Sequence, residues 1–200
     1  MKKIGIISCN TNNLFSISNA FQKLNCKTII SNEKNELLNC DILVLPGVGA
    51  FNVAMDNIKN KNIDDIIFEF VKTGKTFLGI CLGFQLLFET SEEFVKSKGL
   101  GLLKGNVLSF DKNNMIVPHV GWNTVETQNK NLIGPNIDNF YFVHSFYAKP
   151  YNSKNILCLT DYSNFKFCSG VEKDNIFGVQ FHPEKSHRNG MQLLKNFSEI

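Results

Sequence analysis

One segment constrains the fold of this chain of 200 residues more than any other. Residues Thr76 to Phe88 read TFLGICLGFQLLF: an apolar run, then Cys81 with a glycine two residues away on each side, then a second apolar run. A sharp turn from a strand into a helix needs such glycines, because β-carbons there would clash. The segment therefore predicts a nucleophile elbow, in which the Cys81 side chain projects above the edge of a sheet.

The predicted position of Cys81 makes it a candidate nucleophile. At a helix N-terminus, unpaired backbone N–H groups and the positive end of the helix dipole favour a thiolate over a thiol. The alternative is an inert core cysteine, because cysteine is among the most buried residue types. A purely structural turn rarely needs a small residue on both sides of a thiol, so the pattern favours a reactive cysteine.

A second segment, Asn175 to Ser186, reads NIFGVQFHPEKS and ends a strand-like run at His182. The proline that follows disfavours helix at His182, which should therefore be extended. Extended residues two apart face the same way, so Glu184 can orient the imidazole as the acid does in a serine-type triad. The alternative is that His182 only ends a strand and Glu184 is a solvated loop charge.

The two segments are expected to meet in space. Cys81 and His182 both fall at the carboxyl ends of predicted strands, and in a parallel open sheet those ends share one crevice where ligands bind. The sequence thus predicts a triad of nucleophile, base and orienting acid, formed by Cys81, His182 and Glu184.

A third segment, Asp41 to Phe51, reads DILVLPGVGAF and offers donors for an oxyanion. Attack of a thiolate on a carbonyl puts negative charge on the carbonyl oxygen, which backbone N–H groups stabilise. We expect these donors to be the N–H of Leu82 and one from Val48 or Gly49. Taken alone, PGVG is more typical of a simple turn, and only beside the other two segments does it complete a site.

The segments GICLGFQLLF, PGVGAF and GVQFHPEKS resemble the class I (triad) glutamine amidotransferases. Within that family, GLGLLKGNV, VPHVGWN and YFVHSFY are most similar to the glutaminase subunits of imidazole glycerol phosphate synthases, and the resemblance covers nearly the whole chain. It implies that Cys81 attacks the side-chain amide of L-glutamine. Ammonia then leaves, protonated through His182, and water hydrolyses the glutamyl thioester to glutamate.

The resemblance also implies binding residues and a partner. The glutamine pocket would be formed by Gly49, Gln85 and the backbone of Ser145 and Phe146, although Gln85 can equally begin the inward polar edge of a helix. The partner would be a (β/α)8-barrel cyclase subunit that forms a heterodimer with this chain and receives the ammonia, yielding imidazole glycerol phosphate and a carboxamide nucleotide (AICAR) in histidine biosynthesis. The resemblance also implies that Trp122, Tyr141 and Lys185 lie at or near the interface with this partner, because they match positions that the family places there.

Two segments depart from that pattern. Cys9 to Asn13 reads CNTNN where the family usually has a loop with two glycines, and Ser186 to Met191 looks more like paralogous glutaminases that supply ammonia for amidino sugars in surface glycans. That pathway is therefore an alternative. Two others are a stand-alone cysteine hydrolase or peptidase, and a catalytically inactive regulatory module.

Strand and helix signals alternate along the first 80 residues, which is typical of a mostly parallel sheet with helices on both faces. Later runs indicate shorter strands, some antiparallel, before a closing helix over 187–197. We therefore predict an α/β fold forming a single glutamine amidotransferase domain over residues 1–200. The predicted strands are 4–8, 28–31, 42–45, 76–80, 105–110, 122–126, 140–146, 156–160 and 176–181, and the other helices 14–24 and 63–71.

Composition excludes several classes of protein. The net charge is only +3 and the basic residues form no run, so nucleic acid is not an expected partner. No apolar run approaches the roughly 20 residues needed to span a bilayer, so no membrane association is expected. The six cysteines contain no Cys-x-x-Cys pair, which predicts neither a metal nor a disulfide framework, and no cofactor is expected. A reduced, cytoplasmic setting fits best.

Overall fold

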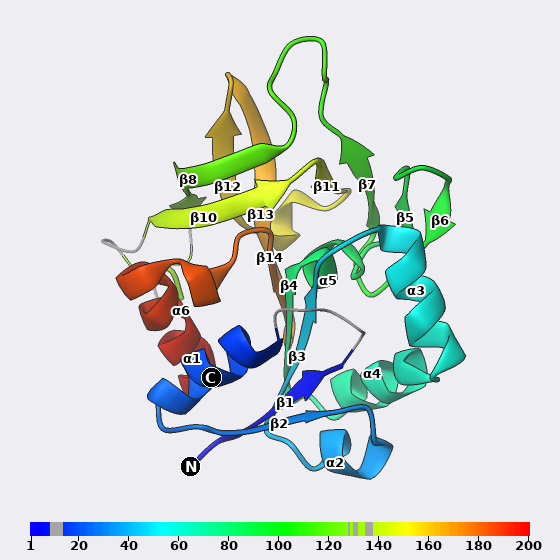
Figure 1. The fold of residues 1–200 in the computed structure, drawn as a ribbon, viewed down its shortest axis with the longest axis vertical. Coiled ribbons are helices and arrows are strands. Elements are labelled where there is room, and N and C mark those ends of the chain that lie inside the picture. Colours follow the sequence, from blue (N-terminus) through cyan, green and yellow to red (C-terminus); the bar gives the residue numbers. More distant parts are fainter. Residues whose placement is uncertain (9–13, 128, 130–131, 135–137) are drawn as a thin grey trace.

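Five parallel strands form the half of the sheet that carries the predicted elbow (Figure 1). Their order is β2-β1-β3-β4-β14, with every neighbouring pair parallel. The computed structural model describes residues 1–8, 14–127, 129, 132–134 and 138–200, so the Cys9 to Asn13 loop lies outside the described residues. The strands are β1 (Lys3–Ile7), β2 (Lys27–Ser31), β3 (Ile42–Gly47), β4 (Thr76–Cys81) and β14 (Ile176–Val179).

Helices cover both faces of this sheet, as predicted (Figure 1). Side chains of β3 alternate between two apolar clusters: Ile42 and Val44 face one, and Leu43 and Leu45 face the other. The first cluster takes the buried faces of α1 and α6, and the second those of α2, α3 and α4. The helices are α1 (Leu14–Lys23), α2 (Lys34–Leu38), α3 (Phe51–Asn60), α4 (Ile63–Lys72) and α6 (His187–Glu199).

Beyond β14 the sheet continues through mostly antiparallel strands, in the order β13-β11-β7-β5-β6. Strand β12 pairs with β13, and β9 pairs with β12. A separate two-stranded antiparallel sheet of β8 and β10 lies across this part of the molecule (Figure 1). These strands are β5 (Thr90–Ser91), β6 (Ser97–Lys98), β7 (Gly105–Ser109), β8 (His119–Thr124), β9 (Glu126–Thr127), β10 (Asn139–His144), β11 (Phe146–Pro150), β12 (Ile156–Tyr162) and β13 (Phe165–Lys173). Three short helical turns complete the fold: α5 (Leu82–Gln85), η1 (Ser153–Asn155) and η2 (Pro183–Lys185).

The α/β class is confirmed, but several elements differ from the prediction. Helices α2 and α3 and strand β13 were not predicted, and the expected single strand over 140–146 breaks at Ser145 into β10 and β11, which belong to different sheets. A run of apolar residues cannot reveal such a change of sheet, because the residues on both sides of the break still alternate. Among the described residues, no helix is long and apolar enough to cross a membrane.

The turn between β4 and α5 is packed as closely as the glycine spacing predicted. A β-carbon on Gly79 would lie 2.7 Å from the carbonyl oxygen of Gly83, and one on Gly83 would lie 1.8 Å from that of Leu45. Both glycines have ordinary φ angles, whereas Cys81 between them has φ 55°. The glycines are therefore needed for space, and the unusual backbone conformation falls on the cysteine.

This packing predicts that Gly83→Ala is strongly destabilising, because the new methyl group would overlap the Leu45 carbonyl in the neighbouring strand. We expect a loss of about 3 kcal/mol in the free energy of unfolding, measured by urea denaturation. Gly74→Ala is the matched control: φ is +78° there, but in the part of the chain that the structure describes no atom lies within 4 Å of the added carbon, so only backbone strain of about 1 kcal/mol is expected. Equal losses in the two variants would contradict the packing argument.

Candidate active site

Cys81 is the last residue of β4, and α5 begins at the next residue. Its backbone has φ 55° and ψ −109°, a combination that costs a non-glycine residue about 1–3 kcal/mol. The side chain is 7% exposed, and Sγ lies 4.0 Å from the backbone oxygen of Val143. A buried thiol is thus held in a strained turn at the carboxyl edge of the sheet, in the geometry of a nucleophile elbow.

His182 and Glu184 follow the end of β14 in the chain and lie at the same edge of the sheet as Cys81. His182 is extended, with φ −102° and ψ 94°, as the following proline predicts. Its Nδ1 is 2.8 Å from Oε1 of Glu184, and both side chains are buried. The expected reason for this contact was wrong, however: Glu184 lies in the 3-10 turn η2, so it reaches the ring through a tight turn and not along an extended strand.

The pKa of His182 results from opposing effects. Burial lowers it, but the negative charge that Cys81 carries as a thiolate and the hydrogen-bonded carboxylate of Glu184 raise it, with a net pKa of about 10. An ordinary histidine has a pKa of 6.5. At neutral pH the ring therefore carries a proton that can be passed to a leaving group.

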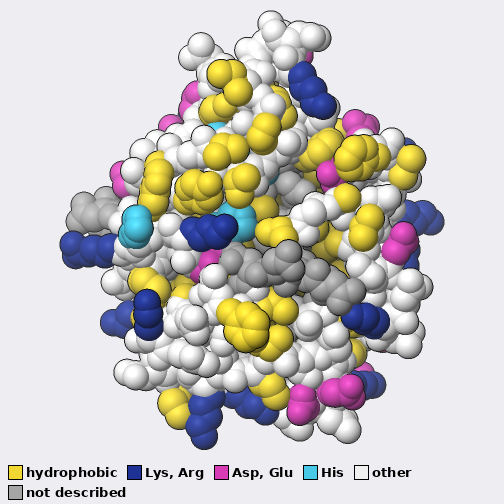
Figure 2. Space-filling model, viewed as in Figure 1, with side chains coloured by type: hydrophobic (Ala, Val, Ile, Leu, Met, Phe, Trp, Pro, Cys, Tyr) yellow, Lys and Arg dark blue, Asp and Glu magenta, His cyan; other side chains and the backbone are white. Residues whose placement is uncertain are grey.

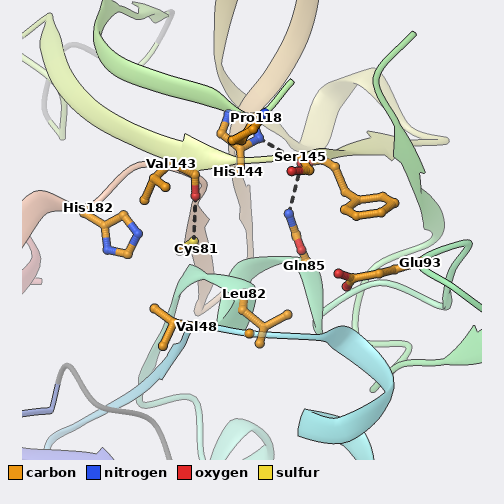
Figure 3. A pocket seen from close by; sticks show the side chains of 12 residues that line it. Val48, Cys81, Leu82, Gln85, Glu93, Pro118, Val143, His144, Ser145 and His182 are labelled. Carbon is orange, nitrogen blue, oxygen red and sulfur yellow. Dashed lines mark hydrogen bonds between the residues drawn. The ribbon is translucent and has the colours of Figure 1, made fainter. Parts of the chain in front are cut away.

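Cys81 and His182 of the predicted triad open onto a cavity of about 350 Å³ at the carboxyl ends of β3, β4 and β14, and Glu184 lies behind the imidazole. Figure 3 shows Cys81, His182 and Gln85 facing this cavity, with Val48 and Leu82 on one side and Ser145 on the other. Each predicted oxyanion and substrate-binding residue lines it. The lining residues are Val48, Gly49, Cys81, Leu82, Gln85, Glu93, Pro118, Val143, His144, Ser145, Phe146 and His182.

The loop after β3 lies next to the elbow because Gly47 pairs with Cys81 across the two strands. A β-carbon on Gly47 would lie 2.9 Å from Cβ of Leu82, so the strand end and α5 are in close contact. Gly49 has φ +106°, and no atom of the described residues lies within 4 Å of its β position. The peptides on either side of Val48 thus combine proximity to the nucleophile with room to rotate.

Gln85 fits both interpretations of its sequence position. It lines the cavity and is only 5% exposed, and its Nε2 donates hydrogen bonds to Phe146 O at 3.0 Å and to Gln180 Oε1 at 2.9 Å. The amide therefore ties α5 to the pocket wall at the break between β10 and β11 and to the residue that follows β14.

Glu93 was not predicted as a site residue, yet its side chain reaches the cavity. Its Oε2 accepts a hydrogen bond of 2.8 Å from the backbone N–H of Phe51, at the start of α3. Burial raises the pKa of this carboxyl, and the Phe51 hydrogen bond partly opposes that effect. Among the described residues that line the cavity, Glu93 is the one carboxylate. In the sequence it stands in a polar stretch, SEEFVKSKG, that looks like an ordinary solvated loop.

His144 also lines the cavity but is held in a neutral form. Its Nδ1 is 2.8 Å from Phe146 O, which can only accept, so Nε2 is the acceptor that faces Nδ1 of His119 at 3.0 Å. Burial lowers the pKa of His144 to about 3 and that of His119 to about 4. This pair therefore supports the turn at Ser145 and carries no charge near neutral pH.

The three predicted interface residues lie close together outside the cavity. Trp122 pairs with Tyr141 across β8 and β10, is 46% exposed, and stacks on His187 with ring centroids 5.1 Å apart. Lys185 is exposed in η2, next to His182 and Glu184. Hydrophobic side chains gather on the face of the molecule over β8 and β10 (Figure 2), and among them are Val120 and Val143, which pair beside Trp122 and Tyr141.

Comparison with known proteins identifies the family. The family model described as "Glutamine amidotransferase class-I" matches residues 6–200. The chain belongs to the class-I glutamine amidotransferases. Its relatives include proteins described as imidazole glycerol phosphate synthase subunit HisH from Sulfurimonas denitrificans (44% identical, 98% of this chain and 97% of that protein) and Pyrococcus furiosus (43% identical, all of both chains). A third, from Methanocaldococcus jannaschii, is 45% identical over 98% of this chain and 99% of the relative.

Solved structures of the same fold are more distant in sequence. The structure of PurLQS from Thermotoga maritima matches with a TM-score of 0.76 at 20% identity over 98% of each chain. Another, described as a glutamine amidotransferase, matches with a TM-score of 0.74 at 17% identity over 98% of this chain and 97% of that one. At this level of identity the likeness concerns the fold, and it agrees with the observed α/β sheet of a class-I amidotransferase.

The raised pKa of His182 predicts a specific pH dependence. A group that binds its proton more tightly in the folded state adds stability that is complete below the unfolded pKa and is lost as the pH rises through the folded pKa. The contribution of His182 should therefore be full below about pH 6.5 and lost by about pH 10. Glu184→Gln should lower the pKa of His182, measured by NMR titration of the imidazole, and should reduce stability more at pH 6 than at pH 10.

Glu126→Gln is the matched control, because it removes an exposed ion pair with Lys166 far from His182 in the sequence. It should leave the His182 titration unchanged. An unaltered His182 titration in Glu184→Gln would contradict the assignment of Glu184 as the orienting acid.

Proposed function

We propose that this chain is a glutaminase that supplies ammonia to a synthase subunit of imidazole glycerol phosphate synthase in histidine biosynthesis. One observation carries the proposal: a buried thiol in a strained turn, an imidazole with a raised pKa and a pocket carboxylate converge on one cavity. The names of relatives that are 43–45% identical over nearly the full chain support the pathway. We further infer that residues 1–200 act as one amidotransferase domain, and that a free catalytic thiol suits a reducing cytoplasm.

The chemistry follows from the positions of the triad. The Cys81 thiolate attacks the side-chain amide carbon of glutamine, and the developing oxyanion accepts N–H groups from Leu82 and from Val48 or Gly49. His182 then donates its proton to the amide nitrogen and the C–N bond breaks. Ammonia departs, and Cys81 remains bound to the glutamyl group as a thioester. Water next adds to the thioester carbon and gives a proton to His182, the C–S bond breaks, and glutamate is released with Cys81 restored.

The pocket also suits the amino-acid end of glutamine. The Glu93 carboxylate can pair with the α-ammonium group, because it is the acidic side chain of the cavity wall. Backbone groups at Ser145 and Phe146 lie where the wall turns from β10 to β11, and they would bind the α-carboxylate. Gln85 secures that turn through its hydrogen bond to Phe146. We assign Gly49, Gln85, Ser145 and Phe146 to substrate binding, with Glu93 added.

The partner proposed here is a (β/α)8-barrel cyclase subunit in a heterodimer. The exposed side chains of Trp122, Val120 and Val143, with the half-buried Tyr141 beside them, support this, since apolar side chains at the centre of a surface patch are typical of protein interfaces. Lys185, three residues past His182, would place a charge at the rim of the same interface. Ammonia released at Cys81 would pass to that partner without entering solvent.

The alternatives differ in measurable ways. A glutaminase for amidino-sugar synthesis would share the triad and pocket but serve another acceptor, and the HisH names of the relatives favour the histidine pathway. A stand-alone cysteine hydrolase would need no partner. An inactive module would not need the strained backbone of Cys81, which costs stability without a chemical use.

Glutamate formation from L-glutamine, measured with and without the cognate barrel subunit, tests the proposal directly. We expect activity to rise on addition of the barrel subunit, and Cys81→Ala to lower it by about 10³-fold or more, because the nucleophile is lost. Full activity of the isolated chain would instead favour the stand-alone hydrolase. Unchanged ammonia production in Cys81→Ala would overturn the triad.

Glu93→Gln tests the substrate-binding assignment. The new amide keeps an oxygen that can accept from Phe51 N–H but loses the charge that would pair with the α-ammonium group. Loss of one charged hydrogen bond corresponds to a rise in KM for glutamine of about 10- to 100-fold, with kcat less affected. Glu92→Gln, on the exposed neighbouring residue, is the control and should leave KM unchanged. A native KM in Glu93→Gln would contradict this role.

A further inference from the structure

Two buried amides form a hydrogen-bonded chain from the pocket wall to the sulfur of Cys81. Nε2 of Gln85 donates to Phe146 O at 3.0 Å and to Oε1 of Gln180 at 2.9 Å. Nε2 of Gln180 in turn lies 3.8 Å from Sγ of Cys81. Gln180 is completely buried, so its amide has no contact with solvent.

The orientation of both amides is determined by the hydrogen bond between Gln85 and Phe146 O. The backbone oxygen of Phe146 can only accept, so Gln85 must present its NH₂ group there. The second hydrogen of the same NH₂ group then meets Gln180, which must present its oxygen. The NH₂ group of Gln180 is therefore the end that faces Cys81. The reverse orientation would set two NH₂ groups against each other and a carbonyl against the sulfur.

The backbone holds Gln180 in this position. Val179 pairs with Ile80 in β14 and β4, so the next residues, Gln180 and Cys81, are neighbours at the edge of the sheet. The N–H of Gln180 also donates to Ser169 O at 2.9 Å. The chain bends at Gln180 and Phe181, and the Gln180 amide faces the thiol, as does the imidazole of His182 (Figure 3).

The contacts of the sulfur differ between its two protonation forms. The backbone oxygen of Val143, at 4.0 Å, can only accept, so it forms a hydrogen bond only with the protonated thiol. The amide of Gln180 donates a hydrogen bond to the sulfur, so it stabilises the thiolate more than the thiol. A donor aimed at the sulfur therefore favours the form that attacks the substrate, and it does so beside the imidazolium of His182.

Resting on the proposed role of Cys81 as the nucleophile, we propose that Gln180 is a positioning residue that donates its amide N–H to the Cys81 thiolate, in an orientation set by Gln85. The role is distinct from the triad, because Gln180 transfers no proton and bonds to no substrate atom. It also gives Gln85 a second task, since the residue that secures the pocket wall orients the donor to the nucleophile.

The test is the rate at which iodoacetamide alkylates Cys81 in the full-length chain, with the modified residue identified by mass spectrometry. Gln180→Met removes the donor at similar size and should slow alkylation about tenfold at pH 7, as expected for loss of one hydrogen bond to a charged group. Thr160→Val is the matched control, because it removes a buried hydrogen bond to Ser169 in the same sheet without a contact to Cys81. It should alkylate at the native rate.

Gln180→Glu separates positioning from packing, because it keeps the shape of the side chain. When ionised, the introduced carboxylate repels the thiolate, and when protonated its O–H can donate to the sulfur in place of the amide. Alkylation relative to the native chain should therefore be slowest at high pH and recover as the pH falls, whereas Gln180→Met should show no such recovery. An equal loss at every pH in both variants would overturn the proposal, as would a native alkylation rate in Gln180→Met.

Glutaminase kinetics with the barrel subunit distinguish this inference from the proposed function. Gln180→Met should lower kcat about tenfold and leave KM for glutamine nearly unchanged, unlike the change expected for a pocket residue. If the native chain forms no glutamate but the alkylation pattern holds, the proposed function fails and the positioning role stands. If glutamate forms and the alkylation pattern is absent, the positioning role is overturned and the proposed function stands.

Discussion

The close contact between the β4–α5 turn and β3 is the constraint on which the rest of the site depends. Gly83 lies so near the Leu45 carbonyl that no β-carbon fits between them, and this contact keeps the turn sharp. The sharp turn in turn places Cys81 at φ 55°, with its sulfur above the sheet edge. Because β3 and β14 flank β4, the loops that follow these strands must meet at that sulfur. One steric contact thus brings Cys81, the loop at Val48 and His182 to one cavity.

Burial and charge act against each other at this edge, and their balance decides the protonation of His182. Burial alone would lower the pKa of His182. The negative charges of Cys81 and Glu184 stabilise the positive ring and raise its pKa to about 10. The nearby His144 has no such partner and stays neutral, with a pKa of about 3. Two buried histidines of one cavity therefore differ in charge because of their neighbours, and only the one beside a thiolate and a carboxylate can act as an acid.

How far the sequence predicts this structure differs from element to element. The parallel strands were predictable because Ile42 to Leu45 and their equivalents are continuous apolar runs bounded by turns. Strand β13 was missed because its run, FKFCSGVEK, mixes charges and a glycine with its apolar residues. The triad residues were predictable because Cys81 stands between two glycines and His182 stands before a proline, and such patterns are seldom needed for structure alone. Glu93 and Gln180 carry no such mark, since the first looks like a loop charge and the second like one polar residue within a strand.

The sequence by itself determined the local geometry of each segment: an elbow at Cys81, an extended His182 before a proline, and a turn with a glycine on each side of Val48. These follow from steric rules that act within a few residues. Only the tertiary structure decided which side chains share the cavity, how Glu184 reaches the imidazole through a 3-10 turn, and which amide faces the sulfur. Those arrangements depend on strand order and register, which bring together residues some hundred positions apart and which no local pattern encodes.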